Sequence, residues 1–201
     1  MELGLFPLGI VLLPTERVPL HIFEPRYREL IGECIDEERD FGLVYADDQG
    51  VRELGTRARV DEVIERFDDG RMNVLVEGGE RFRVERMTRG RSFMTAEVAP
   101  VDDEEGGDPA AEMVTRAMES FRALAAAVEA EAGEIDEEAA QLSFRLAAQV
   151  ELAPESKQEL LELRSEQRRL EMVVELLDGV RQVLVATREL GERAKKNGSR
   201  L

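Results

Sequence analysis

The chain has 201 residues and carries 44 acidic against 27 basic side chains, a formal net charge of −17, with 43% hydrophobic residues and no tryptophan. This composition is typical of a soluble globular protein with an aliphatic core, and the length accommodates one large domain or two small ones. Because so negative a field repels phosphates and anionic lipid headgroups, it disfavours non-specific binding to nucleic acid and to membranes.

The apolar N-terminal stretch does not have the pattern of a secretory leader. Glu2 stands where a basic residue is expected, and Pro7 and Pro14 interrupt the apolar run. No segment is long enough to span a bilayer, and the single cysteine, Cys34, excludes an intrachain disulfide and a cysteine-rich zinc site. We therefore expect a cytoplasmic protein.

One helix is predicted within the first hundred residues, after the stretch "HIFEP". Pro25 suits the first helical turn, because the N–H that proline lacks has no partner there in any case. The apolar residues that follow fall on one helical face: Tyr27, Leu30, Ile31, Cys34 and Ile35.

The rest of this region has the pattern of short β-strands. The segments of strand length are Phe41–Ala46, Thr56–Phe67, Met72–Glu77, Glu80–Met87 and Ser92–Pro100. In the second of these the alternation slips near Glu62, which predicts a bulge or strong bend. Turns are predicted at Asp68–Gly70 and at Glu77–Gly79. Short antiparallel strands joined in this way predict a barrel or a sandwich.

An acidic stretch, "PVDDEEGGDP", divides the chain. It predicts a β subdomain at 1–101, a linker at 102–109, a helical bundle at 110–193 and a polar tail at 194–201. The expected helical stretches are Pro109–Ala130, Asp136–Val150 and Pro154–Glu192, the last with one break or bend.

Four leucines of the last stretch, Leu163, Leu170, Leu177 and Leu184, fall seven residues apart. Val173 and Val180 widen this stripe beyond a two-stranded seam, which favours a bundle helix over a zipper.

Tests for catalytic motifs are negative. None of the three lysines, Lys157, Lys195 and Lys196, follows a glycine-rich turn, which excludes a Walker-type ATPase site. Ser156 and Lys157 are neighbours whose side chains diverge, so they form no credible Ser–Lys dyad. A pair of His21 with Cys34 is disfavoured, because Cys34 lies on the apolar helical face. No catalytic residue, metal or cofactor is predicted.

Taken in order, several motifs resemble the N-terminal substrate-binding domain of the Lon protease family. They are "LFPLGIVLLPTERVPLHIFEPRY", "FGLVY", "ELGTRARVDEV", "VLVEGGERFRV" and "LAPESKQELLEL". The resemblance implies an α+β fold, with a PUA-like antiparallel β pseudo-barrel that has one inserted helix, followed by a C-terminal helical bundle. The sequence departs from a full Lon protease, because it lacks the residues of the ATPase and of the Ser–Lys peptidase, and we therefore expect a free-standing domain.

The function expected from this resemblance is non-enzymatic binding of unfolded or exposed polypeptide segments. A protease or chaperone is a further expected partner, and a homodimer stays open. The candidate substrate-binding residues are His21, Phe23, Arg26, Tyr27, Glu77, Gly78 and Arg81. The alternative is that each serves packing, pairing or backbone geometry. Two other functions stay open: nucleic-acid binding by analogy with PUA-like domains, which the net charge opposes, and assembly through the late helical stripe.

Overall fold

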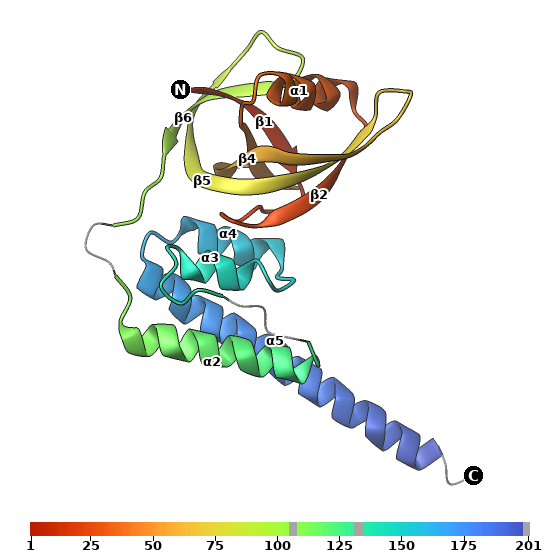
Figure 1. Ribbon diagram of the computed structural model, residues 1–201, viewed down its shortest axis with the longest axis vertical. Helices are drawn as coiled ribbons and strands as arrows, with labels where there is room; N and C mark the ends of the chain where they lie inside the picture. The colour runs from red at the N-terminus through yellow and green to blue at the C-terminus, as the bar shows by residue number, and fades with distance from the viewer. Residues whose placement is uncertain (105–107, 131–134, 199–201) are drawn as a thin grey trace. The chain divides into compact units, whose positions relative to one another are not determined.

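The chain divides into two compact units in a computed structural model that describes residues 1–104, 108–130 and 135–198, with side chains up to residue 188 (Figure 1). The first unit comprises Met1–Glu104 and Ala147–Arg164, and the second comprises 105–146 and 165–201. The elements of the first unit are β1 (Glu2–Leu8), β2 (Arg17–Ile22), α1 (Pro25–Asp36), β3 (Phe41–Asp47), β4 (Gly50–Arg66), β5 (Met72–Thr88), β6 (Met94–Pro100) and α4 (Pro154–Glu162).

The six strands form one mixed sheet in the order β2-β5-β4-β3-β1-β6, and β6 also pairs with the second half of β5. The prediction of an antiparallel sheet is wrong for β1 and β3, which pair in parallel with Leu5 opposite Gly42. The reason is connectivity: β2 and α1 lie between these strands in the chain, and such a crossover brings the next strand back in the same direction.

Two of the strands are 17 residues long, β4 and β5. The predicted slip near Glu62 is confirmed, because the register between them shifts between Val60 and Glu62. The predicted turn at Asp68–Gly70 is also confirmed, with Gly70 at a φ of 84°. It connects β4 to β5.

The turn predicted at Glu77–Gly79 is wrong, because these residues lie inside β5. Before them β5 pairs with β2, up to Glu77 opposite Arg17, and after them it pairs with β6, from Phe82. A Cβ on Gly78 would lie 2.1 Å from the carbonyl oxygen of Leu13. The glycine therefore serves a close approach of two backbones rather than a turn.

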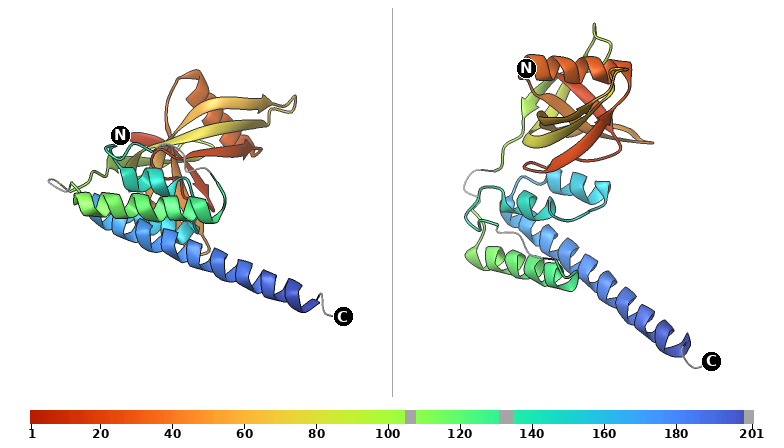
Figure 2. Two further views of the ribbon diagram at one scale, coloured as in Figure 1. Left: turned by 60° about the horizontal axis from the view of Figure 1, so that its bottom comes forward. Right: turned by 45° about the vertical axis from the view of Figure 1, so that its right-hand side comes forward.

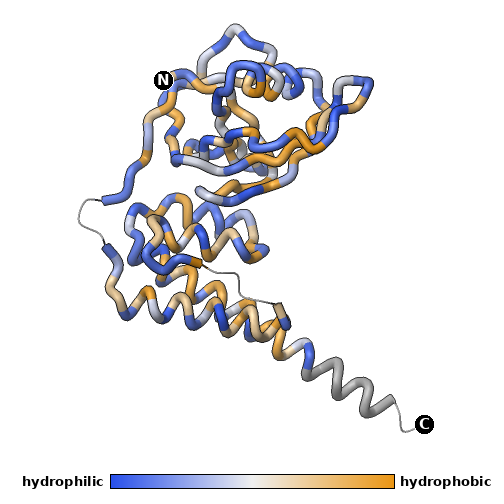
Figure 3. Tube along the Cα trace, in the orientation of Figure 1, coloured by the Kyte–Doolittle hydropathy of each residue, from blue (hydrophilic) through white to orange (hydrophobic). Residues whose placement is uncertain are grey.

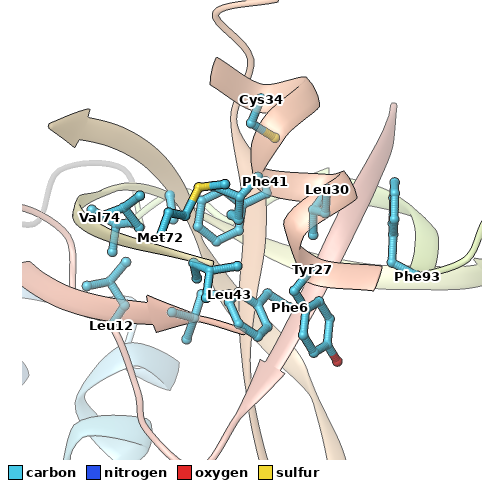
Figure 4. Close-up of a cluster of buried hydrophobic side chains, with 14 residues drawn as sticks. Phe6, Leu12, Tyr27, Leu30, Cys34, Phe41, Leu43, Met72, Val74 and Phe93 are labelled. Atoms are coloured by element: carbon cyan, nitrogen blue, oxygen red, sulfur yellow. The ribbon is translucent and has the colours of Figure 1, made fainter. Parts of the chain in front are cut away.

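The predicted helix α1 is confirmed, with Pro25 in its first turn and Tyr27, Leu30, Ile31 and Cys34 buried. These side chains complete the main core of the unit, which is drawn in Figure 4. A second buried cluster surrounds Phe82. The core is therefore aliphatic with a few phenylalanines, as the composition indicates.

The helix α4 packs in the first unit. The sequence interpretation had instead assigned it to the helical bundle. Tyr45 Oη donates to Glu155 (3.1 Å), and Gln158 Nε2 donates to the carbonyl of Leu54 (3.3 Å). Lys157 also pairs with the nearly buried Glu16. These contacts join residues more than 100 positions apart, and no local pattern announces them.

The first residues of the predicted linker are also fixed on this unit. Asp103 pairs with Arg81, and the N–H of Glu104 donates to the carbonyl of Arg164 (2.9 Å). Residues 105–107 of that predicted linker lie outside the described residues, as does the end of the predicted tail. Independent folding of the predicted domains stays a prediction.

The second unit contains α2 (Ala111–Ala127), α3 (Leu142–Ala147) and α5 (Glu166–Gly198). Helices α2 and α5 lie side by side in Figures 1 and 2, and hydrophobic stretches run along both in Figure 3. The predicted stretch Asp136–Val150 is helical only in α3. The predicted break in the last stretch is confirmed between α4 and α5.

The bundle interpretation of the leucine stripe is confirmed at Leu170 and Leu177, which are buried. A buried polar cluster accompanies them: Arg169 pairs with Glu166, whose carboxylate also accepts from the N–H and hydroxyl of Ser143 (2.8 and 2.7 Å). These bonds fix the start of α3 on α5.

Among the described residues, no helix combines the length and apolar character needed to cross a bilayer.

Candidate functional site

The seven predicted site residues do not lie in one place. His21 is opposite Asn73 in the pairing of β2 with β5, whereas Glu77 is opposite Arg17 at the other end of that pairing. These positions are four residue steps apart along an extended strand, about 13 Å. The structure therefore divides the predicted site into a group before α1 and a group in the middle of β5.

His21 and Phe23 of the first group meet the ring of Phe67, which was not a predicted site residue, and we call these three residues the aromatic cluster. The rings of His21 and Phe23 stack with centroids 5.9 Å apart, and Phe67 meets His21 edge-on at 6.1 Å. His21 Nδ1 donates to Asn73 Oδ1 (2.7 Å), and Asn73 Nδ2 donates to Glu65 (3.1 Å), which orients the imidazole. Phe23 is nevertheless 58% exposed, so the residues that the structure describes leave most of its ring uncovered.

The turn between β4 and β5 holds Phe67 in this cluster. The carboxylate of Asp69 accepts bonds from the backbone N–H of Arg71 (3.1 Å) and from its Nε (2.7 Å). These bonds hold the pKa of Asp69 below its ordinary value. The Arg71 guanidinium lies 5.2 Å from the Phe67 ring centroid, and Arg28 of α1 donates to the carbonyl of Asp69. Hydrogen bonds from Arg71 and Arg28 therefore stabilise the turn that carries Phe67.

Arg26 and Tyr27 have separate roles beside this cluster. Arg26 pairs with Glu24 (2.8 Å) at the surface, and its guanidinium lies 4.6 Å from the Tyr27 ring centroid. Tyr27 is buried against Phe6, with ring centroids 4.0 Å apart (Figure 4). Burial raises the pKa of Tyr27, and Arg26 opposes that shift only in part. Arg26 is thus a rim residue, and Tyr27 belongs to the core.

The second group stabilises the fold. Glu77 forms a surface pair with Arg59 (3.2 Å), and Gly78 permits the close approach of Leu13. Arg81 is only 3% exposed, and its guanidinium reaches the end of α4. We therefore remove Gly78 and Arg81 from the candidate binding surface.

The contacts of Arg81 explain its burial. Its Nη1 donates to the carbonyls of Leu161 (2.9 Å) and Leu163 (2.6 Å), and its Nη2 pairs with Asp103. The carbonyls at a helix C-terminus have no intrahelical partner, and a buried cation satisfies them there. Arg81 therefore fixes the end of α4 and the segment after β6 on β5.

Sequence reasoning missed Phe67 and Asn73 as parts of the site. Phe67 directly precedes the turn signal Asp68–Gly70, and an aromatic residue at a turn next to an end strand could have indicated it. Asn73 becomes relevant only through its register with His21, which the sequence alone does not specify.

The aromatic cluster has the chemistry to contact apolar groups. Among the described residues, no three histidine, cysteine or acidic side chains are placed to hold a metal ion. Cys34 lies in the core, where burial raises the pKa of its thiol to about 11 and keeps it protonated at neutral pH. Phe23, stacked on His21, offers an exposed aromatic surface.

The outer edge of strand β2 is a second feature of this region. In the sheet it pairs with β5 alone among the described strands. Pro19 lies opposite Leu75, and because proline has no N–H to donate, its nitrogen must face the outer edge. By alternation, Arg17 and His21 direct their backbone groups to the same edge. An extended chain could therefore pair there on both sides of Pro19.

Comparison with known proteins identifies a family. The profile described as "ATP-dependent protease La (LON) substrate-binding domain" matches residues 2–179. A Lon protease of Brevibacillus choshinensis is 27% identical over 99% of this chain and 28% of its own length. Lon protease 1 of Hydrogenovibrio crunogenus is 23% identical over 93% of this chain and 25% of its own length. The chain spans about a quarter of these relatives.

Two solved structures are similar over most of both chains. The Lon N-terminal domain protein from Xanthomonas campestris superposes with a TM-score of 0.68 at 29% identity, covering 87% of this chain and 97% of that one. The N-terminal domain of Mycobacterium avium complex Lon protease gives a TM-score of 0.69 at 19% identity, covering 89% and 98%. The second likeness concerns the fold alone.

Proposed function

Since the chain belongs to the LON substrate-binding domain family, we propose that it is a non-enzymatic module that binds unfolded or exposed polypeptide segments at the aromatic cluster. The observation that carries this proposal is the 58% exposure of Phe23, stacked on His21 beside the end strand β2. Large aromatic side chains on rigid supports supply much of the binding energy where proteins meet.

The proposed mode is an extended segment that lies along β2 and places an apolar side chain against Phe23. Backbone bonds at Arg17 and His21 supply affinity that does not depend on sequence, and the aromatic cluster selects apolar residues. The rim charges Arg26 and Arg71 are paired with Glu24 and Asp69, so they do not select strongly for one charge. This combination suits ligands that share exposed apolar groups and little else.

We also propose that the sheet is the PUA-like pseudo-barrel that the sequence motifs imply. The pairing of β6 with both β1 and the second half of β5 supports this closure. A protease or chaperone is a fitting partner for such a module, because binding alone leaves the captured segment unprocessed.

Fluorescence anisotropy with a labelled model protein that can be prepared both in a stable unfolded form and in its folded form tests the binding proposal. In the absence of ATP, we expect saturable binding to the wild-type protein and no binding of the same model protein in its folded form. Phe23→Ala should weaken binding by about tenfold, the effect of losing a moderate aromatic anchor.

The matched control is Val51→Ala, which removes another exposed hydrophobic side chain of the first unit. It should leave the affinity within about twofold of wild type. Equal losses in the two variants, or no binding by the wild-type protein, would count against the aromatic cluster as the site.

Assembly is a second candidate function, supported by α5. Beyond Leu177 no described side chain of this helix is buried, and Val183 is 67% exposed. A second copy of the chain could cover this stripe. Light scattering over a concentration series tests this alternative, and a constant monomer mass would exclude it.

A further inference from the structure

A pocket of about 510 Å³ lies at the opposite end of α1 from the aromatic cluster. The pocket takes Leu30, Glu33 and Cys34 from the second half of α1, whereas His21 and Phe23 precede the helix. The apolar part of the pocket lining includes Met1, Leu3, Leu30, Cys34 and Phe93, and the basic part includes Arg39, Arg57, Arg89 and Arg91. This volume is in the range of sites for small ligands.

Two of the four arginines have hydrogen-bonding capacity left. Arg57 is largely covered, with 21% of its side chain exposed, yet its nearest carboxylate oxygen, on Asp40, is 3.7 Å away. Its other amine contacts the sulfur of Met1, which is a weak acceptor. Arg89 has no hydrogen bond or ion pair with any residue that the structure describes. Donors so placed at a pocket suit an anionic ligand, because guanidinium binds carboxylate through two parallel bonds.

The other two arginines are compensated. Arg91 pairs with Glu33, and Arg39 pairs with Glu37 at 2.9 Å and with Glu33 at 3.6 Å. Arg39 and Arg91 therefore stabilise the pocket lining, and their charges are already neutralised by Glu33 and Glu37.

The acidic residues of the lining decide which anion fits. The lining contains four acidic residues, Glu2, Glu33, Glu38 and Asp40, whose negative charges equal in number the positive charges of the four arginines. A dianion such as phosphate would meet this acidic half of the wall, whereas a single carboxylate can use Arg57 and Arg89 alone. The apolar floor requires that this carboxylate be attached to an apolar body.

We propose that this pocket binds a monocarboxylate carried on an apolar body. N-acyl amino acids and the C-terminal residue of a polypeptide share that chemistry. Only the second source rests on the proposed function. In that case the pocket binds the C-terminus of a polypeptide, and the aromatic cluster binds internal segments.

Calorimetric titration separates the two sources. The probes are N-acetyl-leucine and a heptapeptide that ends in leucine, the latter as the free acid and as the C-terminal amide. We expect the free acid to bind at least about tenfold more tightly than the amide. Binding of N-acetyl-leucine as well would assign the site to small acids, and binding of the peptide acid alone would assign it to chain ends.

Variants locate the site. Arg89→Gln, at an exposed position, and Arg57→Gln should each weaken binding of the free acid by about tenfold, whereas Arg83→Gln, a surface control outside the pocket, should not. Phe23→Ala should leave this binding unchanged even if it abolishes capture of unfolded protein. The proposal is overturned if acid and amide bind equally, if no acid binds at millimolar concentration, or if Phe23→Ala alone removes binding.

Discussion

Arg81 shows how one buried charge can hold distant parts of a unit together. It lies in β5 and bonds to two carbonyls at the end of α4 and to Asp103 after β6. In the sequence it follows a Gly-Gly-Glu stretch and has the surroundings of a surface residue on a hairpin. Only the return of the chain at Leu161 and Leu163 makes it a buried one.

Replacing Arg81 by methionine keeps most of the side-chain volume but leaves Asp103 and the carbonyls of Leu161 and Leu163 without their donor. We expect Arg81→Met to lower the free energy of unfolding by about 3 kcal/mol, measured by urea denaturation. The control is Arg83→Met, since Arg83 is exposed and lies 3.6 Å from Glu53. It should change the free energy by no more than about 0.5 kcal/mol. Similar values for the two variants would contradict the role given to Arg81.

At the scale of elements, local signals predicted well and long-range pairing did not. Pro25 and the apolar positions after it predicted α1, and the slip in alternation near Glu62 predicted the bulge in β4. Both predictions depend only on residues that are close together in the sequence. The parallel pairing of β1 with β3 depends on the path of everything between them. The glycines of β5 look like a turn locally, although they mark the exchange of β2 for β6 as partner strand.

The neighbouring residues Gly78 and Gly79 allow a matched test of the close approach of β5 to Leu13. A Cβ at Gly78 would lie 2.1 Å from the Leu13 carbonyl oxygen, whereas one at Gly79 would meet the Arg57 oxygen at an ordinary 3.6 Å. Gly78→Ala should therefore destabilise the protein by about 2 kcal/mol or more, because a backbone has to move.

Gly79→Ala should be neutral or stabilising by about 0.5 kcal/mol, since alanine restricts the unfolded chain. Thermal unfolding of the two variants side by side checks this. If Gly78→Ala were as stable as Gly79→Ala, the close approach of β5 to Leu13 would be refuted.

For the whole molecule, composition and charge excluded more than they identified. They disfavoured membrane and nucleic-acid ligands, and the ordered motifs indicated the family that the profile match then showed. The packing of α4 in the first unit could not be predicted from the sequence, because it depends on long-range contacts such as that of Tyr45 with Glu155. Of the predicted site residues, His21 and Phe23 are exposed and stack on each other, whereas Tyr27 and Arg81 are buried; their part in binding stays a prediction.

The central claim is that unfolded polypeptide binds at Phe23, and site-specific photo-crosslinking tests it most directly. A photoreactive phenylalanine analogue replaces Phe23 in one variant and Val51 in another, and each is irradiated with a model protein in its unfolded or folded form, without ATP. We predict a crosslinked product only from position 23 and only with the unfolded form. A product of equal yield from position 51, or none from position 23 while binding persists, would contradict the claim.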